Sequence, residues 1–316
     1  MKTPFFWREA RPGEAPAVEL RPVDVLIVLC CAWAVLLLLG PYRWAPGART
    51  SALVYLLFAL GPLVLRLLES VYPQQRLLAF VACFWLLPVT SLGHEFLSPL
   101  VTGFAPGLRD AQLAALDARL FGTQVSVWLG PLVPPWLTEV LLLCYYGHFV
   151  WPVVLGLVLY FTGRREAFDE YLLALGLFMA VNYVLYAWVP AIGPRYFLVG
   201  AFAQPLHGLW LTPYLESALR QPHFIRDCFP SGHTGVALLV LLFSWRYERR
   251  VFRVMCLPGL GLIAATLVGR FHYATDLLCA VPLVLGATGV ALAWSRLTLR
   301  RASLARPVTM DAIVRS

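Results

Sequence analysis

Residues 229–247 read FPSGHTGVALLVLLFSWRY, and residues 270–295 read RFHYATDLLCAVPLVLGATGVALAWS. In each stretch a short polar segment leads into a long apolar run of the kind that crosses a bilayer as a helix. The polar segments place His233, His272 and Asp276 at the mouths of these helices. Ionisable groups are costly to keep at such positions, which indicates a functional site.

The composition of the chain excludes an ordinary soluble domain. Of its 316 residues, 60% are hydrophobic and 13% are charged, and the mean hydropathy is +0.73. A soluble domain carries about 25% charged residues. We therefore expect an all-α, polytopic membrane helix bundle of about eight transmembrane helices. The predicted spans are 24–40, 51–68, 77–92, 136–161, 168–189, 232–247, 251–269 and 273–295.

The order of these runs predicts three regions. Residues 1–76 hold an N-terminal tail and two accessory helices, 77–300 hold a six-helix core, and 301–316 form a basic tail. The span at 77–92 is short and contains Pro88, so it is the weakest of the eight. Residues 93–135 mix glycine, proline and acids with leucine and tryptophan, which predicts helices lying in the outer interface.

The net charge of +8 reflects topology rather than binding to nucleic acid. If the N-terminus is cytoplasmic, 17 of the 25 basic residues, Arg66 among them, fall on the inner side. We therefore expect both termini in the cytoplasm and the polar segments outside. Arginine used almost without lysine is typical of a GC-rich genome, and we expect a bacterial inner membrane with a periplasmic site. The outer basic residues are Arg43, Arg49, Arg109, Arg119, Arg195, Arg220, Arg226 and Arg270.

His272 and Asp276 are spaced i and i+4, so on a helix they share one face. The carboxylate can then accept a proton from one imidazole nitrogen and leave the other nitrogen as a nucleophile or base. The alternative is a polar pair that ties the top of the helix to a neighbour.

Residues 230–233 predict a helix start that binds an anion. Ser231 is a plausible N-cap, Gly232 allows a ligand to approach the backbone, and the helix N-terminus favours negative charge. His233 would give a proton to a leaving oxygen there. Alternatively, this is an ordinary helix start with an interfacial histidine.

Two outer arginines are candidates for binding phosphate oxygens. Arg195 follows a Gly-Pro pair, and Arg270 stands two residues before His272. The planar guanidinium binds phosphate through paired donors. Either side chain could instead extend to lipid headgroups.

These residues resemble the motifs of the type 2 phosphatidic acid phosphatase superfamily, whose members have a six-helix membrane core. The family motifs are Lys-x6-Arg-Pro, Pro-Ser-Gly-His and Ser-Arg-x5-His-x3-Asp. The second is intact at 230–233, and the end of the third is intact at His272 and Asp276. The resemblance implies that His272 becomes phosphohistidine, that Asp276 orients it, and that His233 protonates the leaving group, with no metal or other cofactor.

The chain departs from the other family positions. The first motif would place lysine and proline where Trp188 and Tyr196 stand, and the third would place serine and arginine at Ala265 and Thr266. By keeping the two histidines and the aspartate while losing these positions, the chain resembles the inositol phosphorylceramide synthase and sphingomyelin synthase branch. Enzymes of that branch pass a phospho-headgroup to a lipid hydroxyl. The substrate implied is a lipid phosphate or phospholipid. Water as acceptor gives a phosphatase, whereas a polyol or lipid alcohol gives a transferase.

Several polar residues remain open to more than one interpretation. His94 is consistent with a structural role at the interface, and Asp227 is a candidate to hold a polyol acceptor. His148 lies mid-span beside Tyr145 and Tyr146, either as a functional group or hydrogen-bonded to a tyrosine.

Two other classes of protein compete with a lipid phosphatase or transferase. His233, His272 and Asp276 could bind catalytic zinc, for which three protein ligands suffice. A transporter or lipid scaffold would place its polar cluster at mid-membrane and contain repeat-related helices. Here the ionisable cluster is predicted at the outer surface, and no repeat is evident. Six of the seven cysteines lie in apolar runs, and only Cys228 lies in a loop. This distribution predicts small buried hydrophobic side chains.

Overall fold

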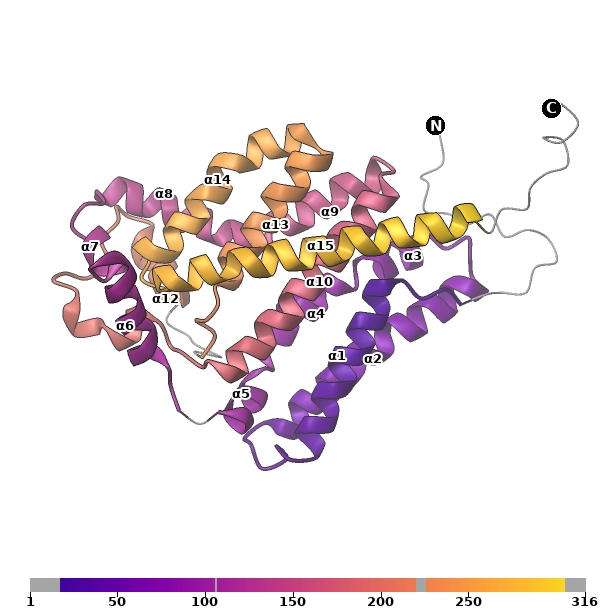
Figure 1. Cartoon of the computed structure of the whole chain (residues 1–316), viewed down its shortest axis with the longest axis horizontal. Coiled ribbons are helices and arrows are strands. Elements are labelled where there is room, and N and C mark those ends of the chain that lie inside the picture. Colours follow the sequence, from indigo (N-terminus) through magenta and orange to yellow (C-terminus); the bar gives the residue numbers. More distant parts are fainter. Residues whose placement is uncertain (1–17, 106, 220–225, 305–316) are drawn as a thin grey trace, which may run out of the picture.

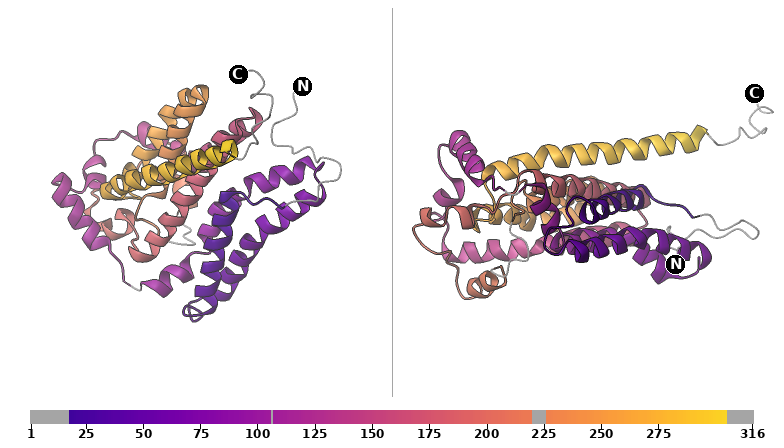
Figure 2. Two further views of the ribbon diagram at one scale, coloured as in Figure 1. Left: turned by 45° about the vertical axis from the view of Figure 1, so that its right-hand side comes forward. Right: turned by 90° about the horizontal axis from the view of Figure 1, so that it is seen from below.

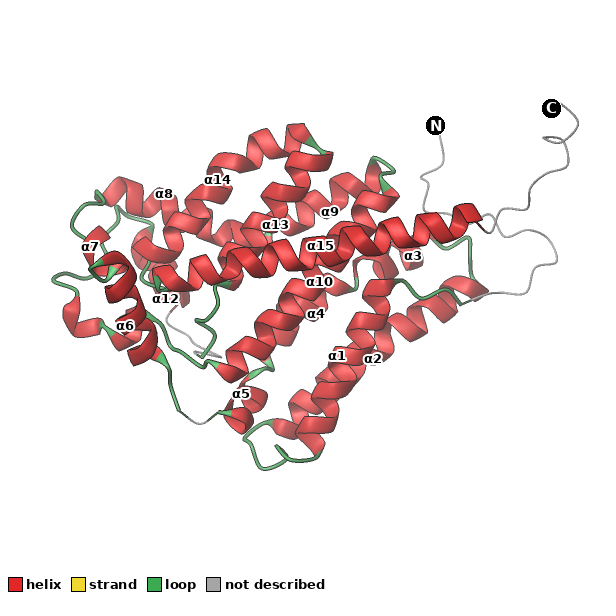
Figure 3. Cartoon of the chain, viewed as in Figure 1, coloured by secondary structure: helices red, strands yellow, loops and turns green. Residues whose placement is uncertain are grey.

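The computed structural model describes residues 18–105, 107–219 and 226–304 (Figure 1). Over these ranges the chain is all-α and contains no strand (Figure 3). The predicted all-α polytopic bundle is confirmed. The predicted tail at 1–17, Arg220 in the outer loop and residues 305–316 lie outside the described residues.

The N-terminal half of the chain forms two long helices followed by shorter ones. Its helices are α1 (Pro22–Leu39), α2 (Ala48–Val71), α3 (Arg76–Phe84), α4 (Leu86–Glu95), α5 (Ser98–Phe104), α6 (Asp110–Phe121) and α7 (Val125–Leu129). The C-terminal half contains the helices that carry the quoted motifs. They are α8 (Pro135–Tyr146), η1 (Gly147–Phe149), α9 (Trp151–Phe161), α10 (Arg165–Trp188), α11 (Pro194–Phe197), η2 (Val199–Ala201), α12 (Thr212–Leu219), α13 (Gly232–Tyr247), α14 (Arg249–Val268) and α15 (Ala274–Leu304).

The number of spans differs slightly from the predicted eight. Five described helices, α1, α2, α10, α14 and α15, are long and apolar enough to cross a membrane, and two bent pairs raise the number to seven. The remaining predicted span, 232–247, corresponds to α13, which has 16 residues. A helix of that length spans about 24 Å, which is less than the roughly 30 Å of hydrocarbon in a bilayer.

Prolines explain both bent pairs. In the first pair α3 and α4 meet at 48°. In the second pair the segment formed by α8 and η1 meets α9 at 48°. A proline cannot donate a hydrogen bond to the carbonyl four residues earlier. Pro88 thus releases the carbonyl of Phe84, where α3 ends, and Pro152 releases the carbonyl of His148. The span predicted at 136–161 is therefore bent, and the bend falls beside His148.

The long helix α10 lies between the α1–α2 hairpin and α15 (Figure 2). It also packs against α13, and the shared interior contains the fully buried rings of Phe168, Tyr171, Phe178 and Phe243. Large apolar side chains such as Leu257 remain exposed on the outside of the bundle, as expected where the solvent is lipid. The helix α15 continues to Leu304, so the first residues of the predicted basic tail are helical.

A buried ion pair joins the accessory helices. Arg66, which the sequence placed among the inner loop arginines, lies inside α2 and is 5% exposed. Its Nε donates to Asp24 Oδ2 of α1 at 2.7 Å, and its Nη1 donates to Glu69 at 2.7 Å. Its Nη2 donates to the carbonyl of Ala82 in α3 at 3.3 Å. One guanidinium therefore connects three helices.

We expect Asp24→Leu to lower the free energy of unfolding by about 3 kcal/mol, because it leaves the Arg66 guanidinium buried without its main partner. The double variant Asp24→Leu with Arg66→Leu should regain most of this loss, since no charge then remains buried. Thermal unfolding of the purified protein in detergent measures the two single variants, Asp24→Leu and Arg66→Leu, and the double variant. Additive losses in the double variant would contradict the pairing.

Candidate active site

The N-terminal ends of α13 and α15 meet at one end of the bundle, beside α6 and α7 (Figure 1). The backbone N–H of Ser231 donates to the carbonyl oxygen of Asp276 at 3.2 Å. The loop that carries Arg195 joins them, because the Arg195 N–H donates to the Arg270 carbonyl at 2.8 Å. Segments far apart in the sequence therefore converge here, as the quoted motifs predict.

His272 is held in one orientation by two acceptors. Its side chain is 5% exposed, and Nδ1 lies 2.8 Å from the carbonyl oxygen of Cys228 and 3.3 Å from Asp276 Oδ2. A carbonyl oxygen can only accept a hydrogen bond, so Nδ1 carries the hydrogen. The neutral ring therefore keeps a lone pair on Nε2, which can attack or accept a proton.

Asp276 is fully buried, and one of its oxygens carries most of its contacts. Oδ2 accepts from the backbone N–H of Tyr273 at 2.9 Å and from Cys228 Sγ at 2.9 Å, in addition to facing His272. His272 lies in the turn before α15, so the two side chains meet through this turn rather than along a helix face. Oδ1 is buried and has no hydrogen-bond partner among the described residues.

Cys228 belongs to this site, although the sequence predicted only an apolar role for cysteines. Burial raises the pKa of its thiol well above the usual range, and the neighbouring Asp276 carboxylate raises that pKa further. The thiol is therefore neutral at physiological pH and serves as a hydrogen-bond donor to Asp276 rather than as a nucleophile.

His233 stands in the first turn of α13 among aromatic rings. Its ring centroid is 5.9 Å from that of His272, 4.4 Å from the stacked ring of Tyr145, and 4.3 Å from His148. His148 is brought here by the bend between α8 and α9. Its Nδ1 is buried without a hydrogen-bond partner in the described parts of the chain. Nδ1 of His148 therefore makes no hydrogen bond to a tyrosine there, and a functional role for His148 stays a prediction.

The start of α13 has the features predicted from the sequence. The Ser231 side chain accepts from the Thr234 N–H at 3.2 Å, which confirms the N-cap. A Cβ added at Gly232 would lie 2.8 Å from the Tyr186 hydroxyl, so only glycine fits without a shift. Because the Ser231 N–H is used by Asp276, the phosphate-binding role of Ser231 and Gly232 stays a prediction.

Arg195 lies at the end of the same stack of rings. Its guanidinium carbon is 5.1 Å from the centre of the Phe271 ring, and Phe271 stacks on Tyr145 at 4.4 Å. Its Nη1 donates to the carbonyl of Gly269 at 3.3 Å. Tyr145 is thus sandwiched between Phe271 and His233, and the stack ends in a cation.

Arg270 turns toward a different loop. Its Nη2 donates to the carbonyl of Gln204 at 2.8 Å, and its guanidinium lies 4.0 Å from the centre of the Phe202 ring. Its φ of 65° places a non-glycine residue in the left-handed region, just before His272. The structure therefore places the Arg195 guanidinium against Phe271, the residue before His272, and phosphate binding by Arg195 or Arg270 stays a prediction.

Two buried acids of α6 hold these loops. Asp110 accepts from the N–H groups of Ile192 and Gly193, at 2.8 Å for Gly193, and from the Tyr273 hydroxyl at 3.0 Å. Gly193 has a φ of 84° at the turn before Arg195. Asp110 therefore fixes that turn against the chain next to His272.

Asp117 caps α15 from outside that helix. It accepts from the N–H groups of Ala274 at 2.9 Å and Thr275 at 2.8 Å, and from the Thr275 hydroxyl. The sequence predicted interfacial helices over 93–135 and missed this buried face. The available signal was the i, i+7 spacing of Asp110 and Asp117, which places two acids on one side of a helix.

His94 and Asp227, which the sequence left unassigned, form a pair. His94 Nε2 lies 3.0 Å from Asp227 Oδ2, and the two side chains are 28% and 34% exposed. The His94 ring also contacts Tyr186, whose hydroxyl borders Gly232. This pair therefore lies next to the start of α13.

The group of possible metal ligands differs from the set expected for zinc. Ligand atoms of Cys228, His272 and Asp276 lie within 4.8 Å of one another. The predicted set had His233 in place of Cys228. His233 instead packs against the rings of Tyr145 and His148.

Comparison with known proteins gives one finding about the family. The model of the PAP2 superfamily matches residues 111–290. No curated protein and no solved structure matches the chain. The matched range contains Asp117, Arg195, His233, His272 and Asp276, and it begins after the accessory helices.

We expect Asp117→Asn to lower both stability and activity, because the amide nitrogen would face N–H donors at the start of α15. Hydrogen bonds to a charged group contribute about 1.5–3 kcal/mol, so the loss should be of that order. Thermal unfolding in detergent and turnover of a lipid phosphate measure it. Arg119→Gln, an exposed change on the same helix, is the control. Equal behaviour of the two variants would contradict the capping role.

Proposed function

Because the chain belongs to the PAP2 superfamily, we propose that it is an integral-membrane lipid phosphatase or phosphotransferase that works through His272. The observation that carries this proposal is the hydrogen bond from Nδ1 to the Cys228 carbonyl. It leaves the Nε2 lone pair of His272 as the nucleophile.

The proposed reaction has two steps. Nε2 of His272 forms a bond to phosphorus as the bond from phosphorus to the leaving oxygen breaks, and His233 gives that oxygen a proton. An incoming water or alcohol then attacks phosphorus, returns a proton to His233, and releases His272. The ring separation of 5.9 Å supports this assignment, since attack begins at about 3–3.5 Å and proton transfer at about 2.6–3.2 Å.

The charge that develops on the phosphoryl oxygens needs donors fixed in advance. Arg195 is suited to this role because packing on the Phe271 ring and the Gly269 carbonyl hold its guanidinium next to the segment that carries His272. The N-terminus of α13 contributes the positive end of a helix dipole. Asp276 orients His272, and Ser231 and Gly232 shape the helix start.

We propose that the reaction takes place at the outer leaflet, on the periplasmic side of a bacterial inner membrane. The excess of arginine on the opposite side supports this orientation. The short helix α13, whose N-terminus carries His233, would set the site slightly below the membrane surface.

Transfer of a phospho-headgroup, such as phosphoinositol, is the finer form of the proposal. It is supported by the replaced family positions. Thr266 stands where the family motif has arginine, and its carbonyl accepts from the N–H groups of Phe271 at 2.9 Å and His272 at 3.1 Å. This buried residue supports the turn and offers no cation to a phosphate. Fewer phosphate ligands suit a phosphodiester, which carries less charge than a terminal phosphate.

We expect His272→Gln to abolish covalent labelling of the protein by a lipid carrying radioactive phosphate, since no nucleophile remains. His233→Gln should slow turnover by roughly 10²–10⁴-fold, the usual contribution of a general acid. The exposed His207→Gln is the matched control. Covalent labelling that persists in His272→Gln would contradict the proposed mechanism.

The same purified protein distinguishes the acceptors and the metal alternative. In a panel of lipid phosphates and phospholipids with and without inositol, free phosphate indicates a phosphatase and a new headgroup lipid indicates a transferase. Activity should survive EDTA. Loss of activity on chelation, with zinc bound to the purified protein, would favour a metal site at Cys228, His272 and Asp276 instead.

A further inference from the structure

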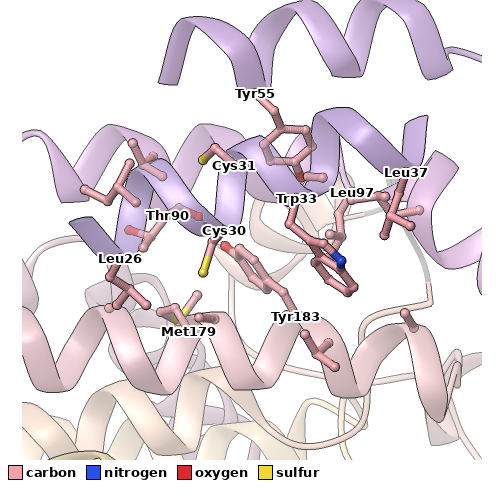
Figure 4. Close-up of a pocket in the computed structure, with 18 of the residues that line it drawn as sticks. Leu26, Cys30, Cys31, Trp33, Leu37, Tyr55, Thr90, Leu97, Met179 and Tyr183 are labelled. Carbon is pink, nitrogen blue, oxygen red and sulfur yellow. Dashed lines mark hydrogen bonds between the residues drawn. The ribbon is translucent and has the colours of Figure 1, made fainter. Parts of the chain in front are cut away.

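A cavity lies between the accessory helix α1 and the core helix α10 (Figure 4). Its empty volume is about 930 Å³, including the part open to the surroundings. Met179 and Tyr183 of α10 face Leu26, Cys30 and Trp33 of α1 across it. The lining is almost wholly apolar, which suits a hydrocarbon chain.

The cavity ends near the active site, at α4. Thr90 and Tyr183 both line it, and the Tyr183 hydroxyl donates to the Thr90 carbonyl. One helical turn beyond Thr90 stands His94, whose ring centroid is 6.2 Å from that of Tyr183. His94 pairs with Asp227, and the Cys228 carbonyl, in the next residue, accepts from His272. The partly exposed Asp227 carboxylate therefore lies just beyond the end of the apolar lining, near the proposed nucleophile.

The negative charge of the Asp227 carboxylate decides which lipid headgroup can lie against it. A carboxylate accepts a hydrogen bond from a hydroxyl, whereas it repels a phosphate. A lipid seated in the cavity would therefore place an alcohol, rather than a phosphate, against Asp227.

We propose that this cavity holds the alkyl or acyl chain of a lipid alcohol whose hydroxyl hydrogen-bonds to Asp227. The inference rests on the proposed function, for which it names the acceptor: the lipid hydroxyl attacks the phosphorus held on His272. Asp227 is a positioning residue here, and the proton of the hydroxyl passes to His233 as in the proposed second step.

The cavity works by placing the chain rather than by removing it from water. A lipid chain in the bilayer is already in an apolar medium, so moving it between helices brings little hydrophobic gain. What the cavity supplies is a fixed position, which raises the effective concentration of the hydroxyl at the site. Because α1 lies outside the range that matches the family, this acceptor site is a feature added to the family core.

The test uses a diacylglycerol with a photoactivatable diazirine in one acyl chain, added to the full-length protein in phospholipid vesicles. We expect saturable crosslinks to α1 and α10 that excess diacylglycerol prevents. Ala180→Phe fills the cavity and should reduce this labelling at least 10-fold. Val181→Phe is the matched control, because Val181 is on the same helix but is 44% exposed and outside the lining.

A second variant tests the choice of lipid. In wild type, phosphatidic acid with the same chains should compete at least 10-fold less well than diacylglycerol. Asp227→Asn removes the repulsion between the carboxylate and the phosphate, so the preference for diacylglycerol over phosphatidic acid should fall several-fold. Loss of a merely structural residue would not change this preference. Equal competition in wild type would overturn the proposal and indicate a phosphate-bearing lipid, with Arg226 beside Asp227 as its cation. Unchanged labelling of Ala180→Phe would also overturn it.

Crosslinking needs no turnover, so the two proposals can fail separately. If His272 takes no label from any lipid phosphate but the crosslinks behave as expected, the phosphohistidine mechanism is wrong and the lipid site stands. If His272 is labelled but the crosslinks are insensitive to Ala180→Phe, the cavity proposal is wrong and the catalytic proposal stands.

Discussion

Two carboxylates buried at one end of the helix bundle impose the arrangement on which the site depends. Asp110 and Asp117 of α6 are almost completely shielded from solvent, and a buried charge is tolerated only when hydrogen bonds satisfy it. The donors come from the turn before Arg195 and from the first residues of α15. The same bonds that satisfy the acids therefore fix the two segments that carry Arg195 and His272, and the chemistry is positioned by a helix that takes no part in it.

A second constraint is the packing of the planar groups. Arg195, Phe271, Tyr145 and His233 follow one another face to face. Stacked rings lose little freedom when a ligand binds, so the cation and the acid–base histidine are held at a fixed distance before substrate arrives. The stack takes its members from α8, α11, α13 and the turn before α15. Any shift of α8 would consequently move His233 and Arg195 together.

The sequence predicted what depends on local pattern and missed what depends on long-range contact. Apolar runs located the spans, and short motifs identified His233, His272 and Asp276. The bend at His148 was also readable, since Pro152 lies four residues later. The pairing of His94 with Asp227 was not, because 133 positions separate them and neither stands in a motif. The same holds for Cys228, whose contacts with Asp276 arise only when the loop before α13 closes on α15.

The way in which His272 is held explains why the lone pair stays on Nε2, the nitrogen proposed as the nucleophile. A carboxylate that alone fixed the tautomer would lose this ability on protonation, because a protonated oxygen can donate. Here the shorter contact of Nδ1 is with the Cys228 carbonyl, which cannot titrate. The hydrogen therefore stays on Nδ1 whenever the ring is neutral, whatever the charge on Asp276. In the proposed mechanism, that division leaves Asp276 free to stabilise the cationic ring that would form with phosphorus bound to Nε2.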